Sequence, residues 1–480
     1  MSELLLPSFT SSSRDLNDAF RIALGDIHGN VTWYQEGLLD EPRPCLMAGL
    51  DYDTPWTRDA AINTWNACGL IREEVCRDTL LSVLTREEGR VVIGGQYWDA
   101  MIWTVGAWEY YLFTGDEEFL RLAFEATRNS LGFFEQTELD ELTGLFRGPA
   151  VYGDGVAAYP DRYVALPDRP SGILAWPRAN PDARARRGYG IPMHALSTNC
   201  VYARAYELAT RIATELGAAA DPSWIGKADA LRAQIDAHFW DGERGTYRYL
   251  VDAWGGCDRQ EGMGIAFAML FGIAGADRAA LLCDSTHRTA AGIPCVWPTY
   301  ERYASVEPGH SYGRHSGTVW PHIQGFWADA CSHAGRADLA FEELSLLARA
   351  AARDAHFTEI LHPDTGLPYG GLQEGGREGI RLWSSCRRQT WSATAFLRVI
   401  LRVVFGIRPE ADGLTFAPSL PPGVEEAAID GLRYRGTPLR VELRGSGSRV
   451  ASCAIDGNPA DRAVIDPEGG HRSVEIELEP

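Results

Sequence analysis

Apolar residues recur at the three- and four-residue spacing of amphipathic helices along most of the chain. This periodicity predicts about twelve helices before residue 407. They are expected near residues 14–24, 60–68, 72–85, 96–113, 116–136, 194–217, 223–240, 262–274, 278–286, 316–334, 336–353 and 388–406. Alternating patterns typical of strands are scarce over the same span.

Short turns join these helices in pairs, as at residues 114–116 and 334–336. Long connections rich in Gly, Pro and aromatic residues separate the pairs, at 137–193, 287–315 and 354–387. Loops longer than ~15 residues are usually functional. Six helical hairpins with long loops on one side predict an all-α fold, an (α/α)6 barrel with its site at the loop end. A helical solenoid and two smaller bundles are the alternatives, and the lack of a fixed repeat counts against the solenoid.

The pattern changes after Gly406, where Pro and Gly become frequent and short alternating runs appear at 414–416, 439–443 and 473–478. These runs predict a small antiparallel β appendage that packs against the barrel. We therefore expect three parts: a loose leader and helix over residues 1–25, the barrel over 26–406, and a β-rich segment over 407–480.

The formal net charge of −20 argues against a nucleic-acid partner and against an anionic membrane surface. No apolar run reaches the ~18 residues that span a bilayer. The first seven residues lack the basic and long apolar regions of a secretory signal, so a cytoplasmic protein is expected. Oligomeric state cannot be read from the sequence, and a homo-oligomer stays open.

Ten Cys occur without a Cys-x-x-Cys pair, which favours free buried thiols. Zinc-ligand spacings, a Gly-x-Ser-x-Gly elbow and a phosphate-binding P-loop are also missing from the sequence. We expect neither a metal nor a cofactor.

Fifteen Trp are the informative excess, and several stand beside carboxylates, such as Trp56 near Asp59 and Trp98 before Asp99. Aromatic faces next to hydrogen-bonding carboxylates suit sugar rings, which have apolar faces and hydroxyl rims. Each Trp taken singly is more often a core residue. The set as a whole favours a carbohydrate ligand.

Glu359 is the first candidate for chemistry, because it follows a strongly helical segment and precedes the turn Pro363-Asp364-Thr365-Gly366. Phe357 and Ile360 would anchor the loop that carries it. One interpretation is an ordinary surface Glu beside a tight turn. The other is a general base held on a rigid support.

Asp154 is the second candidate, within the long loop after the helix near residues 116–136. It lies between Gly153 and Gly155, which gives its backbone unusual freedom. An Asp-Gly turn is the simpler interpretation. The surrounding aromatic and Pro residues also suit a carboxyl group kept protonated by apolar neighbours, as a general acid requires.

Two further segments begin predicted helices with polar and aromatic side chains. The first runs over residues 309–326 and contains Arg314, His315 and Trp320. His315 suits acid–base work, but a hydrogen bond to a sugar hydroxyl is the preferred interpretation. The second, 387–391, contains Gln389 and Trp391.

Four stretches, in order, resemble the (α/α)6-barrel glycoside hydrolases of the glycogen-debranching, processing α-glucosidase and mannosylglycerate hydrolase type. They are Trp56-Thr57-Arg58-Asp59, Tyr97-Trp98-Asp99, the run from Tyr312 to Pro321, and Glu359-Ile360-Leu361-His362-Pro363-Asp364-Thr365-Gly366. The last is the most specific, because it is similar to the family segment that bears the general base. The resemblance covers roughly residues 30–420. Asp154 takes the position of the general acid, although those relatives often have Asp-Asn-Ser-Pro where this chain has Asp154-Gly155-Val156-Ala157.

The resemblance implies an inverting hydrolase of an α-glucoside or α-mannoside, a small carbohydrate substrate. Asp154 would protonate the glycosidic oxygen and Glu359 would activate the attacking water. Implied substrate-binding residues are Trp56, Arg58, Asp59, Tyr97, Trp98, Asp99, Arg314, His315, Trp320, Gln389 and Trp391.

Three other functions stay open on the same residues. A sugar phosphorylase would need a cationic phosphate pocket in place of the carboxylate base, and Arg387-Arg388 is the adjacent basic pair near the site. An epimerase or isomerase would rely on His pairs, and five histidines keep it open: His310, His315, His322, His356 and His362. A non-catalytic carbohydrate-binding barrel would bind glycosides without turnover.

Overall fold

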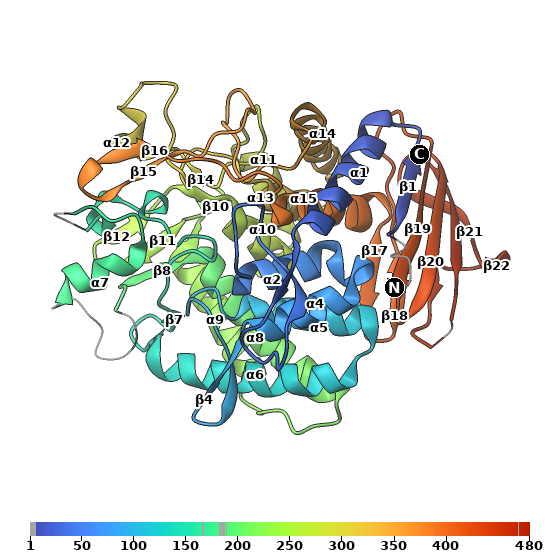
Figure 1. Cartoon of the computed structure of the whole chain (residues 1–480), viewed down its shortest axis with the longest axis horizontal. Coiled ribbons are helices and arrows are strands. Elements are labelled where there is room, and N and C mark those ends of the chain that lie inside the picture. Colours follow the sequence, from blue (N-terminus) through green and yellow to red (C-terminus); the bar gives the residue numbers. More distant parts are fainter. Residues whose placement is uncertain (1–5, 166–167, 182–187, 189, 469) are drawn as a thin grey trace.

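The computed structural model of the chain describes residues 6–165, 168–181, 188, 190–468 and 470–480. The first five residues of the expected leader lie outside this range. Helices predominate up to residue 404, and a β-rich part follows at one side of the helical part (Figure 1). A mainly helical fold with a C-terminal β segment is thereby confirmed. Within the described residues, no helix is long and apolar enough to cross a membrane.

Six helices form a closed inner ring among the described residues. Each contacts the next in chain order, and the last contacts the first again. They are α2 (Thr57–Asn63), α5 (Ile102–Thr114), α8 (Leu196–Glu215), α10 (Gly262–Leu270), α13 (Pro321–His333) and α15 (Thr390–Arg398). The turns of η1 (Thr64–Cys68) and α3 (Gly69–Ile71) continue α2, and η7 (Val399–Val404) continues α15.

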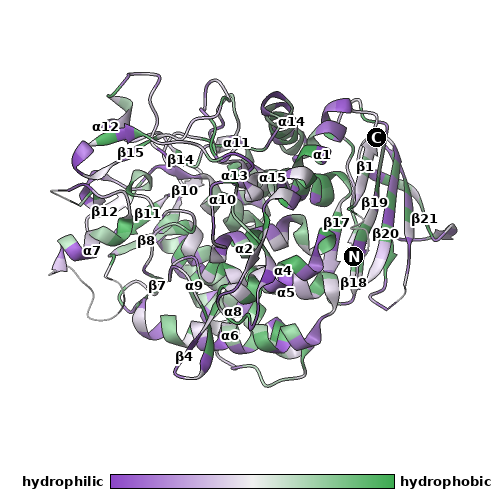
Figure 2. Ribbon diagram, viewed as in Figure 1, coloured by the Kyte–Doolittle hydropathy of each residue, from purple (hydrophilic) through white to green (hydrophobic). Residues whose placement is uncertain are grey.

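A second set of helices alternates with the ring helices along the chain. These are α1 (Arg14–Gly29), α4 (Glu73–Ser82), α6 (Glu117–Thr137), α9 (Trp224–Phe239), α11 (Ala276–Ser285) and α14 (Ala337–Asp354). α4 packs on α2 and α5, α6 on α5 and α8, α9 on α8, and α14 on α13 and α1. Hydrophilic and hydrophobic residues alternate along α6 (Figure 2), whereas α10 is buried over Gly262–Met269. Amphipathic helices therefore cover more apolar ones.

Short strands occur in the connections, where the sequence predicted loops. They form small sheets: β2 (Val31–Tyr34) with β3 (Arg43–Leu46), β4 (Leu84–Glu87) with β5 (Arg90–Ile93), β6 (Leu139–Asp140) with β7 (Leu145–Phe146), β9 (Trp240–Asp241) with β10 (Thr246–Tyr247), β13 (Gln260–Glu261) with β14 (Val296–Trp297), β15 (Leu372–Glu374) with β16 (Ile380–Leu382), and β8 (Met193–Ala195) with β11 (Leu250–Asp252) and β12 (Gly255–Cys257). Strands of two to four residues are too short for a recognisable alternation.

Short helical turns also interrupt the long loops. They are η2 (Val156–Ala158), η3 (Asp161–Tyr163), η4 (Ile173–Ala175), α7 (Trp176–Ala179), α12 (Glu301–Ala304) and η6 (Gly376–Glu378). The loops at the N-terminal ends of the ring helices are thus built structures that support side chains at fixed positions.

The C-terminal part contains two sheets. Three strands make the smaller one: β17 (Ile407–Glu410), β18 (Gly413–Phe416) and β23 (Val464–Ile465). The larger one has the order β1 (Ser8–Ser11), β19 (Glu426–Tyr434), β20 (Thr437–Gly445), β24 (Ser473–Glu479), β21 (Arg449–Ile455), β22 (Asn458–Ala460). Its pairs are antiparallel except β20 with β24. Residues 8–11, which were expected to be a loose leader, form its edge strand.

Alternate residues of β19, including Ala427 and Ile429, face a hydrophobic core that the helices share. The same cluster of buried side chains runs from Phe20 of α1 through Phe405 to Val441 of β20. The β-rich segment is therefore packed against the helices through a continuous core.

Candidate active site

A cavity of about 340 Å³ opens where the ring helices begin. Its lining comes from the first turns of α2 and α15, from the loops ahead of α2, α5, α13 and α15, and from the loops after β7 and α14. The lining residues are Ala48, Tyr52, Trp56, Arg58, Asp59, Gln96, Tyr152, Asp154, Gly155, Ser171, Gly172, Leu174, Arg314, His315, Trp320, Glu359, Gln373, Trp383, Gln389 and Trp391. Segments far apart in the sequence thus meet around one space.

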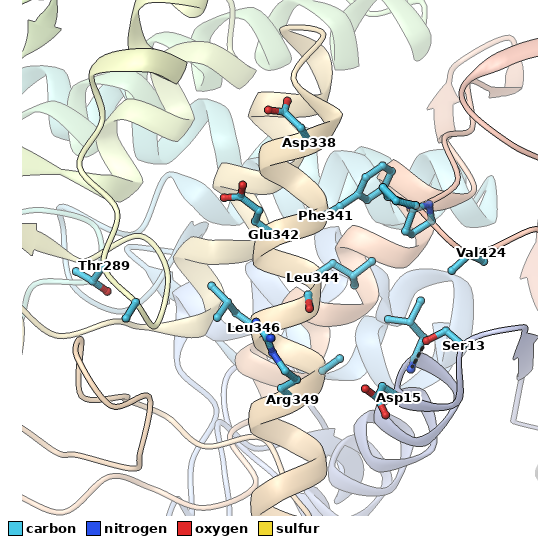
Figure 3. A pocket seen from close by; sticks show the side chains of 16 residues that line it. Ser13, Asp15, Thr289, Asp338, Phe341, Glu342, Leu344, Leu346, Arg349 and Val424 are labelled. Atoms are coloured by element: carbon cyan, nitrogen blue, oxygen red, sulfur yellow. Dashed lines mark hydrogen bonds between the residues drawn. The ribbon is translucent and has the colours of Figure 1, made fainter. Parts of the chain in front are cut away.

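A larger hollow of about 700 Å³ lies elsewhere, between α14, α1 and the segment around Val424 (Figure 3). The side chains drawn there are mostly apolar, such as Phe341, with scattered polar and charged groups such as Asp15 and Arg349. The sequence-predicted site residues do not line it. The smaller cavity is therefore the one with the chemistry.

Ten of the predicted site residues line the smaller cavity, and three lie behind it. Asp99 is buried beneath the wall, and its Oδ2 accepts a hydrogen bond from Arg58 Nη1 at 2.9 Å. Tyr97 and Trp98 are in the core, packed edge to face with their ring centroids 5.1 Å apart. These two were expected to bind substrate, but they are not in the lining.

Glu359 lies on the loop after α14, which ends at Asp354 and turns through Ala355 at φ 57°. The loop backbone is fixed on both sides of Glu359. The Phe357 N–H donates to Asp26 Oδ2 at 2.7 Å, the Glu359 N–H donates to the Cys386 carbonyl at 2.9 Å, and Leu361 pairs with Val319. The expectation of a carboxylate on a rigid loop is met by this arrangement.

Three donors hold the Glu359 carboxylate. The Tyr52 hydroxyl donates to Oε1 at 2.8 Å, and Arg314 Nη2 and the Cys386 N–H donate to Oε2 at 2.9 and 3.1 Å. Gly371, at φ 74°, lets the returning loop pass against Arg314, since a Cβ there would lie 2.3 Å from the Arg314 Cα. Glu359 is only 2% exposed, so its orientation is set by these partners.

Asp154 faces the cavity from the opposite segment of chain. Its carbonyl accepts the Ile173 N–H at 2.8 Å, and Gly155 pairs with Gly172. Its carboxylate accepts a hydrogen bond from Arg58 Nη2 at 3.1 Å and lies 3.9 Å from His315 Nε2. About a third of the side chain is exposed, at 35%.

The charges around Asp154 set its protonation. Burial raises the pKa of this carboxyl, but Arg58, His315 and Arg314 together hold the pKa below its usual value. The sequence suggested apolar neighbours that keep the group protonated. That expectation is wrong, because Arg58 donates a hydrogen bond to this carboxylate and the positive charge of Arg314, from a distant segment, also lowers its pKa.

Arg58 is the centre of a buried charge network. Besides Asp99 and Asp154, it donates to Gln96 Oε1 at 2.8 Å and lies 4.0 Å from Asp59 Oδ2. Burial raises the pKa of Asp59 to about 7 and that of Asp99 to about 6, despite the nearby guanidinium. One cation thus positions several carboxyl groups with different proton affinities.

Aromatic rings form the cavity wall beside this network. His315 stacks on Trp320 with centroids 4.8 Å apart, and Trp391 meets Trp320 edge to face at 5.7 Å. Burial lowers the pKa of His315 to about 3, so the imidazole is neutral at physiological pH. It suits hydrogen bonding to a hydroxyl, which was the preferred interpretation.

Several buried polar atoms of the lining have no hydrogen-bond partner among the described residues. They are Trp56 Nε1, Asp59 Oδ1, His315 Nδ1, Gln373 Oε1, Gln389 Oε1 and Trp391 Nε1. Buried polar groups are normally satisfied. A hydroxyl-rich ligand that accepts from the indoles and donates to the carbonyl and carboxylate oxygens would satisfy them.

Sequence reasoning missed Tyr52, Gln96, Tyr152, Gln373 and Trp383, all of which line the cavity. Tyr52 stands between two Asp residues in an aromatic stretch, which was a signal for a binding segment but not for a contact with Glu359. Gln373 lies on β15 and Trp383 directly follows β16, in a hairpin whose strands are too short to predict.

Residues 99–392 match the family model described as the mannosylglycerate hydrolase MGH1-like glycoside hydrolase domain, more than half of the 480-residue chain. The chain belongs to this family. Residues 407–461 match the C-terminal domain of glycosyl hydrolase family 65. The resemblance to glycoside hydrolases of the mannosylglycerate hydrolase type, and the expectation of a glycoside hydrolase, are thereby confirmed. No curated protein sequence matches the chain.

Solved structures agree in fold. One named as a sialidase has TM-score 0.66 at 14% identity and covers 95% of this chain and 40% of its own. The GH63 mannosylglycerate hydrolase from Thermus thermophilus, in complex with Tris and D-glycerate, has TM-score 0.57 at 18% identity. The match covers 80% of this chain and 99% of that hydrolase. The GH78 rhamnosidase of a Bacillus species has TM-score 0.56 at 16% identity. The match covers 99% of this chain and 44% of the rhamnosidase. The chain thus spans less than half of the sialidase and of the rhamnosidase.

Proposed function

We propose that this MGH1-like domain is an inverting hydrolase of an α-glucoside or α-mannoside, in a small oligosaccharide or glycosyl conjugate. Asp154 is the general acid and Glu359 the general base. The observation that carries the proposal is the pair of carboxylates, on loops far apart in the sequence, that line one aromatic-walled cavity. Two carboxyl groups with room for a water between them are what inversion requires.

Glu359 suits the base because its carboxylate is fixed by donors on both oxygens. It would take a proton from a water that attacks the anomeric carbon from the side opposite Asp154. The mechanism requires a separation of ~6.5–9.5 Å between the two carboxyl groups. The unpaired polar atoms of the wall would hold the sugar hydroxyls.

Asp154 must carry a proton when the substrate is bound, although the positive charges around it hold its pKa below the usual value. Burial is the largest influence on that pKa, and it acts in the raising direction. A sugar that covers the exposed third of the side chain would strengthen this influence. Substrate binding therefore favours uptake of the proton that Asp154 gives to the glycosidic oxygen.

The substrate-binding roles proposed for the remaining predicted residues differ with their position. Trp56, Asp59, His315, Trp320, Gln389 and Trp391 would contact the sugar directly, which their place in the lining supports. Arg58 and Arg314 would act by holding the two carboxylates. Asp99 would act through Arg58, and Tyr97 and Trp98 would support the wall from the core.

We further propose that the helical part is an (α/α)6 barrel, with the β-rich segment over 407–480 after it. The expected start at residue 26 moves back to Arg14, because α1 (Arg14–Gly29) packs on α14 and α15 as one of the outer helices. The closed ring of six helices among the described residues, and the second set of helices packed on it, support the barrel. The family 65 C-terminal match beginning at residue 407 supports that boundary.

The proposal is tested by Glu359→Gln and a substrate panel. We expect kcat on the cleaved glycoside to fall by ~10²–10⁴, the contribution of general acid–base catalysis. Disaccharides and glycosyl-glycerates of α-glucose and α-mannose form the panel, and ¹H NMR of the first-formed sugar reports its anomer. A β-anomer from an α-glycoside supports inversion.

The matched control is Asp364→Asn, which removes a carboxylate from the same loop but outside the cavity. We expect this variant to retain kcat. Full activity of Glu359→Gln, or retention of the α-anomer, would contradict the assignment.

A further inference from the structure

A third cavity, of about 200 Å³, lies at the end of the helix ring away from the candidate active site. Trp391, near the start of α15, lines the candidate active site, whereas Arg398, at the end of the same helix, lines this cavity. The step of seven residues from Trp391 to Arg398 corresponds to ~10 Å along the helix axis. β17 of the C-terminal segment contributes one wall, through Arg408 and Glu410.

Arginines converge on this cavity in a protein whose net charge is −20. Five guanidinium side chains line it, and Arg232 joins them through a shared carboxylate. The six are Arg204, Arg211, Arg232, Arg398, Arg402 and Arg408. Glu410 is an exposed carboxylate in the lining.

The carboxylates in direct contact are fewer than the guanidiniums. Asp329 is shared by Arg398 and Arg408, at 2.7 and 3.0 Å. Glu207 is shared by Arg204 and Arg232, and Glu109 holds Arg402 at 2.6 Å. Among the described residues, no ion pair is formed by Arg211. Positive charge is therefore in local excess.

Two of the lining arginines also have one buried nitrogen without a hydrogen-bond partner. Within the described part of the chain, neither Arg398 Nε nor Arg204 Nε has a partner, although both atoms are buried. Arg398 is only 2% exposed and forms part of the floor. Burial and the neighbouring Arg402 lower the pKa of Arg398 to about 10, even with Asp329 beside it. Burial and Arg211 likewise lower the pKa of Arg204. An anion in the cavity would relieve both effects.

The cavity is open to solvent on one side. Arg211, His333 and Glu410 are exposed, and they line the same space as the buried Arg398 and Arg402. Trp65, Trp108 and Phe271 supply flat apolar faces between the cations. The volume suits a ligand no larger than one small ring with a charged group.

We propose that this cavity, at the end of the ring away from the candidate active site, binds a phosphate group, either free or on a small sugar. Arginine forks match phosphate oxygens in two-pronged hydrogen bonds. The bound group would bridge α8, α15 and β17, and so would join the helical part to the β-rich segment. This binding is separate from the proposed glycoside hydrolysis, because the two cavities share no lining residue.

Calorimetric titration of the full chain tests the proposal, with ionic strength held constant by sodium chloride. The three titrants are inorganic phosphate, glucose 6-phosphate and glucose. We expect saturable binding of inorganic phosphate if the group binds free, and much tighter binding of glucose 6-phosphate if the ring contributes. Binding of neither phosphate compound beyond that of glucose would overturn the proposal.

Variants locate the site. Arg211→Gln removes an exposed guanidinium without an ion-pair partner, and Arg408→Gln leaves Arg398 paired with Asp329. Each should weaken phosphate binding about tenfold or more, the effect of a lost hydrogen bond to a charged group. Arg86→Gln, on the exposed β4–β5 hairpin, is the matched control and should not change it.

Phosphate binding that is equal in wild type, Arg211→Gln and Arg408→Gln would place the anion elsewhere and overturn the assignment. If Arg408→Gln fails to fold, Arg211→Gln decides alone, because its side chain supports no ion pair. Failure of this titration would leave the hydrolase test with Glu359→Gln unaffected.

Discussion

At the scale of single residues, the two candidate catalytic carboxylates differ in their partners. Glu359 is held by neutral and cationic donors on both oxygens, whereas Asp154 has one oxygen on Arg58 and a partly exposed side chain. The less constrained group is the one that must exchange a proton with the leaving oxygen. The experiment on Asp154 should therefore test its role as a proton donor.

Asp154→Asn should lower kcat/KM on the natural glycoside by ~10²–10⁴, because the leaving oxygen is no longer protonated. The loss should be much smaller, about tenfold or less, on the corresponding α-glycosyl fluoride, since fluoride departs without an acid. Steady-state rates on both substrates measure the ratio. Equal losses on the two substrates would indicate a structural role for Asp154.

The pH dependence of the wild type follows from the same contacts. Arg58 and Arg314 help to hold the pKa of Asp154 below its usual value, so this carboxyl is largely ionised near neutral pH and its protonated fraction increases as pH falls. We expect kcat/KM to rise from about pH 8 towards about pH 5, and this rise to be absent in Asp154→Asn. A profile in which kcat/KM falls towards acid would argue for another acid.

Among the site residues that the sequence did not predict, Tyr52 has the most direct contact with the proposed base. Tyr52→Phe removes the hydroxyl that donates to Glu359 Oε1 at 2.8 Å. Loss of a hydrogen bond to a charged group costs about 1.5–3 kcal/mol, so kcat should fall about 10- to 100-fold. KM should change less, because the carboxylate loses orientation while the sugar pocket stays intact.

Tyr312→Phe is the matched control for that measurement. Its hydroxyl donates to Asp364, a residue of the same loop that lies outside the cavity. We expect kcat to be retained in this variant. A larger effect from Tyr312 than from Tyr52 would show that general loop stability, and not the bond to Glu359, controls the rate.

At the scale of secondary-structure elements, periodicity predicted the long helices well and the short strands poorly. A helix such as α14, over Ala337–Asp354, shows several turns of alternating faces in its sequence. The expected first helix, 14–24, continues to Gly29 because Asp26 and Ile27 are also buried. Hairpins such as β15–β16 depend on pairing across a turn, which a single sequence does not reveal.

The elements around the site are joined by a buried carboxyl group that was not predicted. Glu261 precedes the first residue of α10, and its Oε2 accepts the Ser197 N–H at the start of α8 at 3.1 Å. Burial raises the pKa of Glu261 from 4.5 to about 8. The folded state therefore disfavours its ionisation relative to the unfolded chain.

Glu261→Gln should change how stability depends on pH. Below about pH 4.5 the wild-type carboxyl is protonated in both states, and its contribution is fully present. As pH rises from 4.5 to about 8 the unfolded chain releases this proton first, so wild-type stability falls by an amount on the order of a few kcal/mol. Urea unfolding at several pH values should show a flatter dependence for the variant. Identical slopes would contradict the raised pKa.

At the scale of the whole molecule, the sequence predicted the class of fold and half of the cavity lining through its resemblance to a family. It did not predict which side chains point inward. Tyr97 and Trp98 share a motif with Asp99, yet all three lie behind the cavity wall, because packing against neighbouring helices decides that question. Arg58 and Arg314 contact the two carboxylates only because the closed ring of helices brings distant segments of the chain together.

The N-terminal strand shows the same dependence on long-range contacts. Residues 8–11 have no helical or strand pattern that distinguishes them from a leader, yet β1 pairs with β19 of the C-terminal sheet. Phe9 lies 5.1 Å from Phe20 of α1 and 6.1 Å from Phe405 between ring centroids. One side chain near the start of the chain therefore links the helices to the β-rich segment.

Phe9→Ala should consequently destabilise the whole molecule without touching the site. Truncation of a buried Phe costs about 3–5 kcal/mol, and Phe9 is 7% exposed, so the free energy of unfolding should fall by about 3 kcal/mol. Phe133→Ala, at a side chain 47% exposed on α6, is the control and should cost under about 1 kcal/mol. Chemical denaturation measures both, and kcat at about 25 °C should match wild type in each. If Phe9→Ala is as stable as wild type, the other contacts of the β-rich segment hold it in place. If kcat is lost, the packing of β1 affects the catalytic loops.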